Sequence, residues 1–415
     1  MSRTRSARRP PRRTPRGPRR PLARRTRCAL PLLLVPLLLP LLMPLLAAPP
    51  AAAATGAAHR RGSHAVCTRP HRGFAHCDAV LATDGVRPLV SSTPAGLTPT
   101  DVQGAYGLPA DGGAGRTVAI VDAYDDPAAA ADLAVYRATS GLPPCGTGDG
   151  CLRVVGGDGT SRLPIPNAGW AEEESLDLDA VSAACPACRL LLVEARSSSI
   201  ADLLAAERTA LAAPGVVAVS NSWGGGEPAG AATETAFRSA TVEVTASSGD
   251  SGYGVEFPAS SADVLAVGGT SLTVGPDHRR VRETAWSLAG SGCSASVPKP
   301  GWQRDRSCTR RSVADVAADA DPATGLAVYD SYGLAGGGGW LVVGGTSLAA
   351  PLVAAVHAVA GSTGSTVRQL YAGTAAVHDI TTGHNGSCRA RALCTSGPGW
   401  DGPTGVGSPD GPTGW

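Results

Sequence analysis

Apolar residues in this chain gather in short runs that alternate with alanine-rich stretches of mixed polarity. The runs Thr117–Val121, Leu190–Val193 and Val216–Val219 are almost continuously aliphatic, which is typical of strands buried on both faces. The stretches Ala128–Thr139 and Ile200–Leu211 have the length and composition of helices. This alternation predicts an α/β fold, a three-layer sandwich in which helices cover both faces of a mostly parallel sheet.

A serine stands at the start of another apolar stretch. The segment Gly344–Pro351 leads Ser347 into an alanine-rich run, which predicts a nucleophile at the beginning of a buried helix. A serine hydroxyl attacks a carbonyl only if a positioned base removes its proton. None of the eight histidines stands in a His-Gly context, so a histidine base is disfavoured. The similar segment Gly268–Ser271 continues as a strand-like sequence, which makes Ser271 the weaker candidate.

Two acidic residues four positions apart offer a different base. Within Trp170–Ser182, Glu173 and Asp177 would lie on one face of a helix. Two adjoining carboxyl groups share a proton and titrate as a coupled pair, so they can accept a proton from serine in acidic solution. The alternative is a solvated acidic helix start, which the helix dipole favours.

A glycine- and serine-rich turn supplies a third acidic residue. Asp250 follows the predicted strand Val242–Thr245. One interpretation is a turn aspartate that bonds its own backbone. The other is an acid that is protonated at low pH and donates a hydrogen bond to a developing oxyanion. In an open parallel sheet the active site lies at the carboxyl ends of the strands, where Asp250 and Ser347 can meet.

Together these segments resemble the sedolisins, the serine-carboxyl peptidases, which have a subtilisin-like fold. The resemblance runs from about Tyr106 to the end of the chain and includes Thr117–Asp126 and Ser220–Gly225. The order of the motifs and the Glu-to-Asp spacing of four both agree. Asp122 is expected to have a structural role or to lie at the edge of the site. The resemblance implies four catalytic residues: Glu173 as general base, Asp177 as its proton-sharing partner, Asp250 as oxyanion donor and Ser347 as nucleophile.

The resemblance also implies a substrate-binding edge and one calcium ion. Ser222, Trp223 and Gly224 end a strand whose backbone can pair with an extended peptide, and the Trp223 side chain either faces solvent or packs on the sheet. Calcium prefers six or more oxygen ligands, and glycines let a chain fold its carbonyls inward. A glycine-rich surface loop is the alternative. The implied ligands are the carboxylates of Asp379 and Asp401 and the carbonyls of Ile380, Gly397 and Gly399.

The beginning of the chain has the pattern of an export signal, residues 1–57. The first 27 positions hold twelve arginines and no acidic residue, and an apolar run from Ala29 to about Ala54 follows. The prolines in that run disfavour a retained membrane anchor, and Arg24–Arg25 hints only weakly at twin-arginine export. We expect a secreted, extracellular protein with no stable membrane association. A short arm or pro-segment, 58–97, would then precede the catalytic domain, 98–415. This arm would either be removed by proteolysis or stay attached as an ordered segment.

Export changes both the charge and the redox setting of the chain. Loss of twelve of the 36 basic residues leaves 24 against 34 acidic ones, a formal charge of −10, so nucleic-acid binding is disfavoured. Cys185–Cys188 alone has the spacing of a redox or half-zinc motif. The ten remaining cysteines form close pairs that an exported chain would oxidise to disulfides: Cys67–Cys77, Cys145–Cys151, Cys185–Cys188, Cys293–Cys308 and Cys388–Cys394.

The sequence therefore favours a secreted serine-type endopeptidase that acts on protein or peptide substrates in acid, through an acyl-enzyme and as a monomer. A tripeptidyl exopeptidase of the same family would need a cleft closed by an amine-binding end. A catalytically silent, calcium-stabilised binding module is disfavoured because all four catalytic positions are present.

Overall fold

A computed structural model describes residues 62–85, 87–228, 235–333 and 338–415, so the predicted signal peptide lies outside the described residues. Its main sheet has eight strands: β4 (Thr117–Ala123), β5 (Leu152–Gly156), β6 (Arg189–Ala195), β7 (Val216–Asn221), β9 (Glu243–Ser247), β10 (Leu265–Val274), β11 (Arg280–Ala285) and β14 (Val316–Asp319). The order is β11-β10-β9-β7-β4-β6-β5, with β14 also paired to β10. All neighbours are parallel except the β10–β11 pair. The predicted sheet is confirmed.

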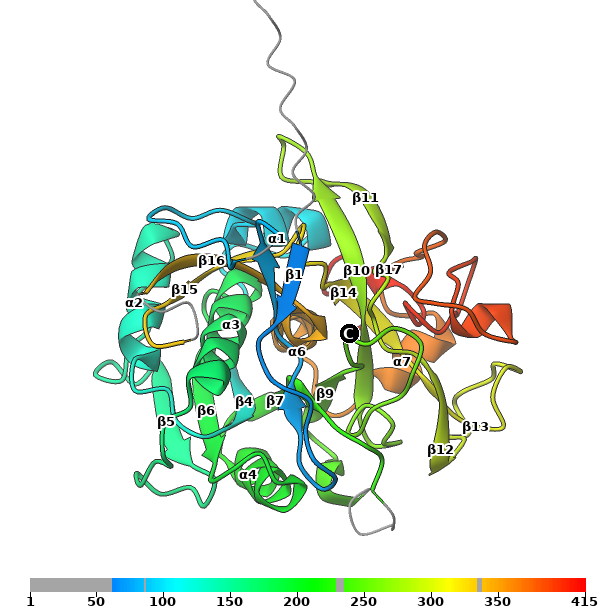
Figure 1. The fold of residues 1–415 in the computed structure, drawn as a ribbon, viewed down its shortest axis with the longest axis horizontal. Helices are drawn as coiled ribbons and strands as arrows, with labels where there is room; N and C mark the ends of the chain where they lie inside the picture. The colour runs from blue at the N-terminus through cyan, green and yellow to red at the C-terminus, as the bar shows by residue number, and fades with distance from the viewer. Residues whose placement is uncertain (1–61, 86, 229–234, 334–337) are drawn as a thin grey trace, which may run out of the picture. The chain divides into compact units, whose positions relative to one another are not determined.

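Helices cover both faces of this sheet. They are α1 (Pro99–Tyr106), α2 (Ala129–Thr139), α3 (Ala168–Ala184), α4 (Ile200–Ala212), α6 (Thr346–Ala360) and α7 (Val367–Ala372), with short 3₁₀ turns at Thr235–Phe237 and Arg391–Leu393. α3 and α6 pack against each other on one face, and α4 packs against β4, β6 and β7 on the other (Figure 1). The predicted helices are confirmed within one residue at their ends, and so is the expected sandwich of helices on both faces of a mostly parallel sheet.

A second, antiparallel sheet was not predicted. It joins β1 (Gly62–Ala65), β3 (Val80–Thr83), β15 (Leu326–Asp330) and β16 (Gly339–Gly344) in the order β1-β3-β16-β15. Residues expected to form a separate arm therefore share a sheet with the strand that leads into α6. The remaining strands form two-stranded pairs: β2 (His76–Cys77) with β8 (Trp223–Gly224), β12 (Gly292–Pro298) with β13 (Arg310–Val313), and β17 (Val377–His378) with β18 (Ser408–Pro409).

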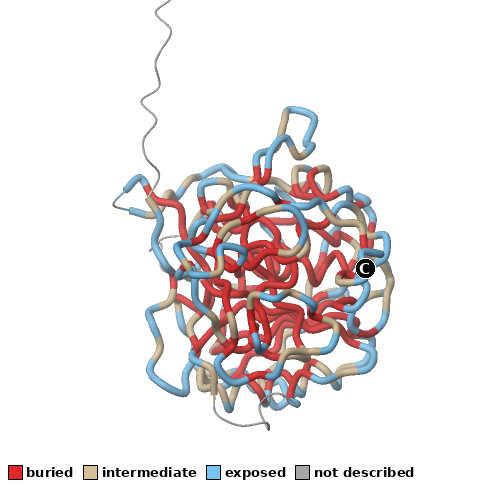
Figure 2. Tube along the Cα trace, turned by 90° about the vertical axis from the view of Figure 1, so that its right-hand side faces the viewer, coloured by how far each residue is buried: buried red, intermediate tan, exposed pale blue. Residues whose placement is uncertain are grey.

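The apolar core surrounds α6. This helix is apolar on all sides, and every residue from 346 to 358 is buried, as expected for a helix in the middle of a large domain. Figure 2 shows the buried stretches of the trace gathered inside a shell of exposed loops. Within the described residues, no helix is long and apolar enough to span a membrane.

All five predicted disulfides are formed. The Cys185–Cys188 bridge follows the end of α3 and lies against Gly113, where a Cβ atom would come within 2.0 Å of the Cys185 sulfur. Both sulfurs are buried and used in the disulfide, which fits a structural bridge and leaves no thiolate in this pair for zinc.

Candidate functional site

Ser347 is the second residue of α6, and a glycine turn sets its position. Gly345 caps the helix with a φ of 95°, a backbone conformation that glycine adopts without strain. The Ser347 hydroxyl donates to the Ser222 carbonyl at 3.1 Å. Pro351 has no N–H to return to the Ser347 carbonyl, and the Ser222 hydroxyl lies 3.2 Å from that free oxygen. The start of the helix is thereby tied to the end of β7.

Glu173 and Asp177 both lie on α3 with no exposed surface. The alternative of a solvated helix start is therefore wrong, because α3 packs between α6, β4 and the second sheet. Burial, followed by the neighbouring Asp177 and Asp122 carboxyls, raises the pKa of Glu173 well above its usual value, and the Ser347 hydroxyl opposes this in part. Two carboxyls and a serine thus share one buried compartment.

Asp177 is the better-bonded member of the pair. The Ser222 hydroxyl lies 2.8 Å from each of its carboxylate oxygens. Burial, then the charge of Asp122, raises the pKa of Asp177 well above normal, while the Ser222 hydroxyl lowers it. Asp122 is the last residue but one of β4, and burial raises its pKa to about 8. Its charge acts on both Glu173 and Asp177, and its role, structural or at the edge of the site, stays a prediction.

Asp250 follows β9 and points across to α6. Its Oδ1 accepts hydrogen bonds from both the amide and the hydroxyl of Thr346 at 2.8 Å, so the interpretation as a self-bonded turn aspartate is wrong. Its Oδ2 is buried and has no hydrogen-bond partner among the described residues. Burial, then the charge of Asp78, raises the pKa of Asp250 well above normal. A protonated Asp250 can therefore donate from Oδ2 toward the space beside Ser347.

The substrate-binding edge predicted at Ser222–Gly224 is occupied by this chain's own N-terminal segment. β2 pairs antiparallel with β8, placing His76 opposite Gly224 and Cys77 opposite Trp223. The Asp78 amide donates to the Ser222 carbonyl at 3.2 Å. In Figure 1 this blue segment crosses in front of α6 and reaches down beside β7. The Trp223 side chain is buried with its ring 6.2 Å from that of Phe257, so it packs on the protein interior.

Three ionisable residues join the site that the sequence gave no reason to single out. His76 Nε2 lies 3.2 Å from Asp78 Oδ1 and 3.6 Å from Glu256 Oε2. Burial lowers the pKa of His76, but the hydrogen bond and charge of Asp78 outweigh this and raise it to about 9. Burial raises the pKa of Glu256 to about 8. The only earlier signal was the position of His76 and Asp78 on either side of Cys77.

The predicted calcium ligands lie in one loop at the C-terminal end. The Gly399 amide donates to Asp379 at 2.9 Å, and the Gly397 amide donates to Asp401 at 3.0 Å. Ile380, beside Asp379, is buried. Burial raises the pKa of Asp401 to about 7, so a nearby cation would favour its ionised form. Carboxylate oxygens are donors that calcium prefers, so the residue types in this loop fit calcium, while the ligand set itself stays a prediction.

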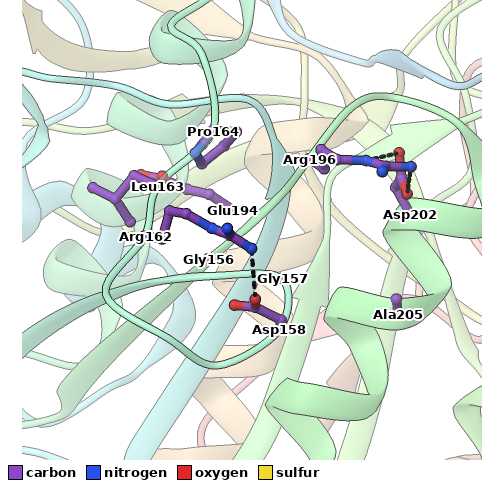
Figure 3. Close-up of a pocket in the computed structure, with 10 residues that line it drawn as sticks. All are labelled: Gly156, Gly157, Asp158, Arg162, Leu163, Pro164, Glu194, Arg196, Asp202 and Ala205. Atoms are coloured by element: carbon purple, nitrogen blue, oxygen red, sulfur yellow. Dashed lines mark hydrogen bonds and ion pairs between the residues drawn. The ribbon is translucent and has the colours of Figure 1, made fainter.

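A cavity of about 530 Å³ lies between the ends of β5 and β6 and the start of α4 (Figure 3). Arg162 and Arg196 at its rim pair with Asp158 and Asp202 at 3.6 and 3.0 Å. Glu194 contributes to its lining, but none of the four predicted catalytic residues does. The cavity is thus separate from the compartment around Ser347.

Comparison with known proteins agrees with this geometry. The subtilase family profile matches residues 167–407. The chain is 36% identical to kumamolisin of Bacillus sp. (strain MN-32) over 369 residues, which cover 77% of this chain and 63% of kumamolisin. It is 35% identical to sedolisin of Pseudomonas sp. (strain 101) over 179 residues, which cover 38% of this chain and 29% of sedolisin. The chain thus matches less than two thirds of the length of these relatives.

Among solved structures, Pseudomonas sedolisin, a serine-carboxyl proteinase complexed with two molecules of pseudo-iodotyrostatin, matches with a TM-score of 0.66 and 27% sequence identity. The match covers 77% of this chain and 96% of that chain. The fold, the sequence profile and these relatives all agree. The chain therefore belongs to the subtilase family and, within it, to the sedolisins, the serine-carboxyl peptidases.

Proposed function

We propose that the chain is a secreted, monomeric serine-type endopeptidase that hydrolyses peptide bonds of proteins and peptides in acidic solution. The observation that carries the proposal is the compartment in which Ser347 shares its surroundings with Glu173 and Asp177, both buried and both with raised pKa values. Such a pair retains a proton to share at low pH, where a histidine base would already be protonated and unable to act.

In the proposed reaction, Ser347 Oγ turns from the Ser222 carbonyl and attacks the peptide carbonyl carbon while Glu173 takes its proton. Asp177 shares the proton of the pair, and protonated Asp250 donates a hydrogen bond to the new oxyanion. The C–N bond then breaks, and the leaving amine takes the proton from Glu173. Water hydrolyses the resulting ester by the same route, which returns Ser347 to its hydroxyl form.

The length of the occupied edge supports an endopeptidase over a tripeptidyl exopeptidase. From Asp78, whose amide bonds Ser222, the bound segment continues past Ala75, which donates to the Ser198 carbonyl at 2.7 Å. Gly73 still accepts from the Ile200 amide at 3.0 Å. A tripeptidyl exopeptidase needs a cleft that closes after three residues. A cleft that holds a longer strand suits cleavage inside a chain.

The proposal includes the signal peptide, 1–57, and one calcium ion held by the loop of Asp379 and Asp401 with the carbonyls of Ile380, Gly397 and Gly399. Calcium would supply positive charge that stabilises this loop near β17 and β18. A catalytically silent binding module is the less favoured alternative, because all four proposed catalytic positions keep their residues, and Asp177 and Asp250 contact Ser222 and Thr346 next to Ser347.

Hydrolysis of quenched-fluorescence peptides from pH 2 to 8 tests the proposal. The full chain is assayed with calcium present, with and without Cys67→Ser/Cys77→Ser, because the N-terminal segment covers the site. We expect an acidic optimum and a loss of at least about a thousandfold in Ser347→Ala and Glu173→Gln. Ser271→Ala, in the second Gly-Gly-Thr-Ser segment, is the matched control and should remain active.

Peptides blocked at the amino end distinguish an endopeptidase from a tripeptidyl exopeptidase, since only an endopeptidase cleaves them. Absence of cleavage in every background and at every pH would overturn the proposal in favour of the silent module. An optimum at neutral pH, with Glu173→Gln fully active, would overturn the carboxyl mechanism.

A further inference from the structure

The N-terminal segment lies in a slot between β8 and the loop that follows β6. On one side, β2 pairs with β8. On the other, Phe74 bridges antiparallel to Ser199, and the Ala75 amide bonds the Ser198 carbonyl at 2.7 Å. An extended peptide bound between two edges satisfies its backbone on both sides, and this is how strand addition holds a peptide. Residues 73–78 therefore have the backbone partners that a bound peptide would have.

The slot continues on the other side of Ser347. β3 pairs antiparallel with β16, with Val80 opposite Gly344, three residues before Ser347. Between the two paired regions lies the peptide bond from Asp78 to Ala79. A Cβ atom on Gly345 would lie 1.8 Å from the Asp78 carbonyl oxygen and 2.7 Å from Asp250 Oδ2. The Asp78 carbonyl thus lies beside the group expected to bind an oxyanion.

The Asp78 side chain fills a pocket of its own. The Ser247 hydroxyl donates to it at 2.6 Å, His76 pairs with it at 3.2 Å, and only 2% of the residue is exposed. Glu256 lies next to His76 and against Gly224 and Gly249, where a Cβ atom would be within 2.0 and 3.0 Å of its carboxyl group. The segment is therefore anchored by a side chain as well as by its backbone.

The segment is also closed into a loop. The Cys67–Cys77 disulfide links positions ten residues apart, and the Val66 amide bonds the Ala79 carbonyl at 3.0 Å. β1 pairs with β3 on the far side of Asp78. Because β1 and β3 hold the two sides of the Asp78–Ala79 bond together, a cut at that bond alone would leave the loop attached. A disulfide also limits the freedom that the loop gains on leaving.

We propose that residues 62–83 are an intramolecular pseudosubstrate held in place by the Cys67–Cys77 disulfide. This segment presents the Asp78 carbonyl to Ser347 and blocks the substrate cleft until it is displaced. The inference rests on the proposed peptidase function, which makes this region a substrate cleft. It rests also on the backbone pairing, which shows that residues 73–78 occupy the region. It assigns the blocking role to a short disulfide loop of this chain rather than to a separately folded domain.

The test uses the full chain with Ser347→Ala, so that no turnover occurs. Two readouts are followed: amide hydrogen exchange at Ala75 and Asp78, and binding of a fluorescent peptide with the sequence of residues 73–80, serine replacing cysteine. In this parent we expect protected amides and no binding of the peptide below about 1 mM, the order of effective concentration of a tethered strand. In Cys67→Ser/Cys77→Ser, protection should fall at least about tenfold and the peptide should bind.

Cys145→Ser/Cys151→Ser is the matched control, because it removes another short disulfide and should behave as the parent. His76→Ala opens the segment without touching a disulfide and serves if the double variant folds poorly. Equal exchange and equal peptide binding in parent and opened variants would overturn the inference. With Ser347 restored, opened variants that stay inactive while exchange and binding change would support the pseudosubstrate and count against the peptidase. Opened variants that are active, but no more active than the parent, would support the peptidase and count against the pseudosubstrate.

Discussion

At the scale of single residues, the proposed mechanism requires Asp250 to be a hydrogen-bond donor, which an aspartate can be only when it is protonated. Its Oδ1 is taken by Thr346, and its buried Oδ2 remains for the oxyanion. Burial and Asp78 raise its pKa, so the protonated form persists upward from acid solution. The donor is lost as the pH rises through this raised pKa, which links Asp250 to an acidic optimum.

Asp250→Asn and Asp250→Ala separate donation from shape. The alanine variant should lose about a hundred- to a thousandfold in kcat, the usual cost of an oxyanion donor. The asparagine variant can accept from Thr346 and donate from its amide at every pH. It should therefore exceed the alanine variant by about tenfold or more, with less decline at higher pH. The measurement is kcat against pH in the Cys67→Ser/Cys77→Ser chain. Identical profiles for the asparagine and alanine variants would contradict the role of Asp250 as a donor.

Glu207 shows what a buried carboxyl does without a catalytic role. It lies on α4 with no exposed surface, and burial raises its pKa from 4.5 to about 8. A carboxyl whose folded pKa is raised contributes most stability below pH 4.5, and this contribution is lost as the pH rises to about 8. Glu207→Gln should match the parent near pH 4 and be more stable by a few kcal/mol above pH 8.

Urea unfolding of both chains in the Ser347→Ala background gives this difference as a function of pH. Asp111→Asn, at an exposed position, is the control. Its free energy of unfolding should differ from that of the parent by the same small amount at every pH. A Glu207→Gln variant less stable than the parent at every pH would show that the carboxyl is held by interactions that favour its charge.

At the scale of elements, continuous aliphatic runs were enough to predict β4, β6 and β7, and alanine-rich stretches of helical length predicted α2 and α4. Each of these elements carries its own local pattern. β1, β3 and β16 were missed because they are short, and their partners are up to some 260 positions away in the chain, as for Leu81 and Val343. Alternation in four residues says little about such a partner. The disulfide loop of Cys67–Cys77 was predicted, but not the slot that receives it.

The C-terminal loop yields a prediction about calcium. If Asp379 and Asp401 bind the ion, calcium at a hundred times its Kd adds about 2.7 kcal/mol to the folded state. A rise in Tm of roughly 5 °C over a chelated sample follows. Asp401→Asn should abolish the rise, and Asp277→Asn, on the exposed turn after β10, should keep it. A Tm in the parent that does not respond to calcium would refute the site.

At the scale of the whole molecule, the candidate catalytic residues could be named from the sequence because each belongs to a motif with its own local sequence, and their roles stay predictions. Their burial could not be predicted, because it depends on α3 packing against α6 and on the N-terminal segment crossing the cleft. Other carboxyl groups are buried well outside the site. Glu174, Asp179 and Asp319 are all buried with pKa values raised well above normal by burial. These buried carboxyls therefore favour the protonated form in the folded protein.

This predicts that the protein is most stable in mild acid. For each such carboxyl the folded pKa exceeds the unfolded one, so its stabilising effect is present near pH 4 and is lost toward pH 8 or 9, the pKa values of Glu207 and Glu194. His357 acts in the opposite sense, because burial lowers its pKa to about 4 and its contribution is lost as the pH falls from 6.5. Asp202 and Asp305, with lowered pKa values, also favour higher pH.

The buried carboxyls outnumber these opposing groups, so the Tm of the Ser347→Ala chain should fall by about 5 °C or more between pH 5 and pH 9. The measurement is a thermal unfolding series at constant ionic strength and constant calcium, so that metal binding does not vary with pH. A Tm that rises toward pH 9 would mean that these carboxyls are ionised and paired in the folded protein, and the acid pair beside Ser347 would then lack the environment that its proposed role requires.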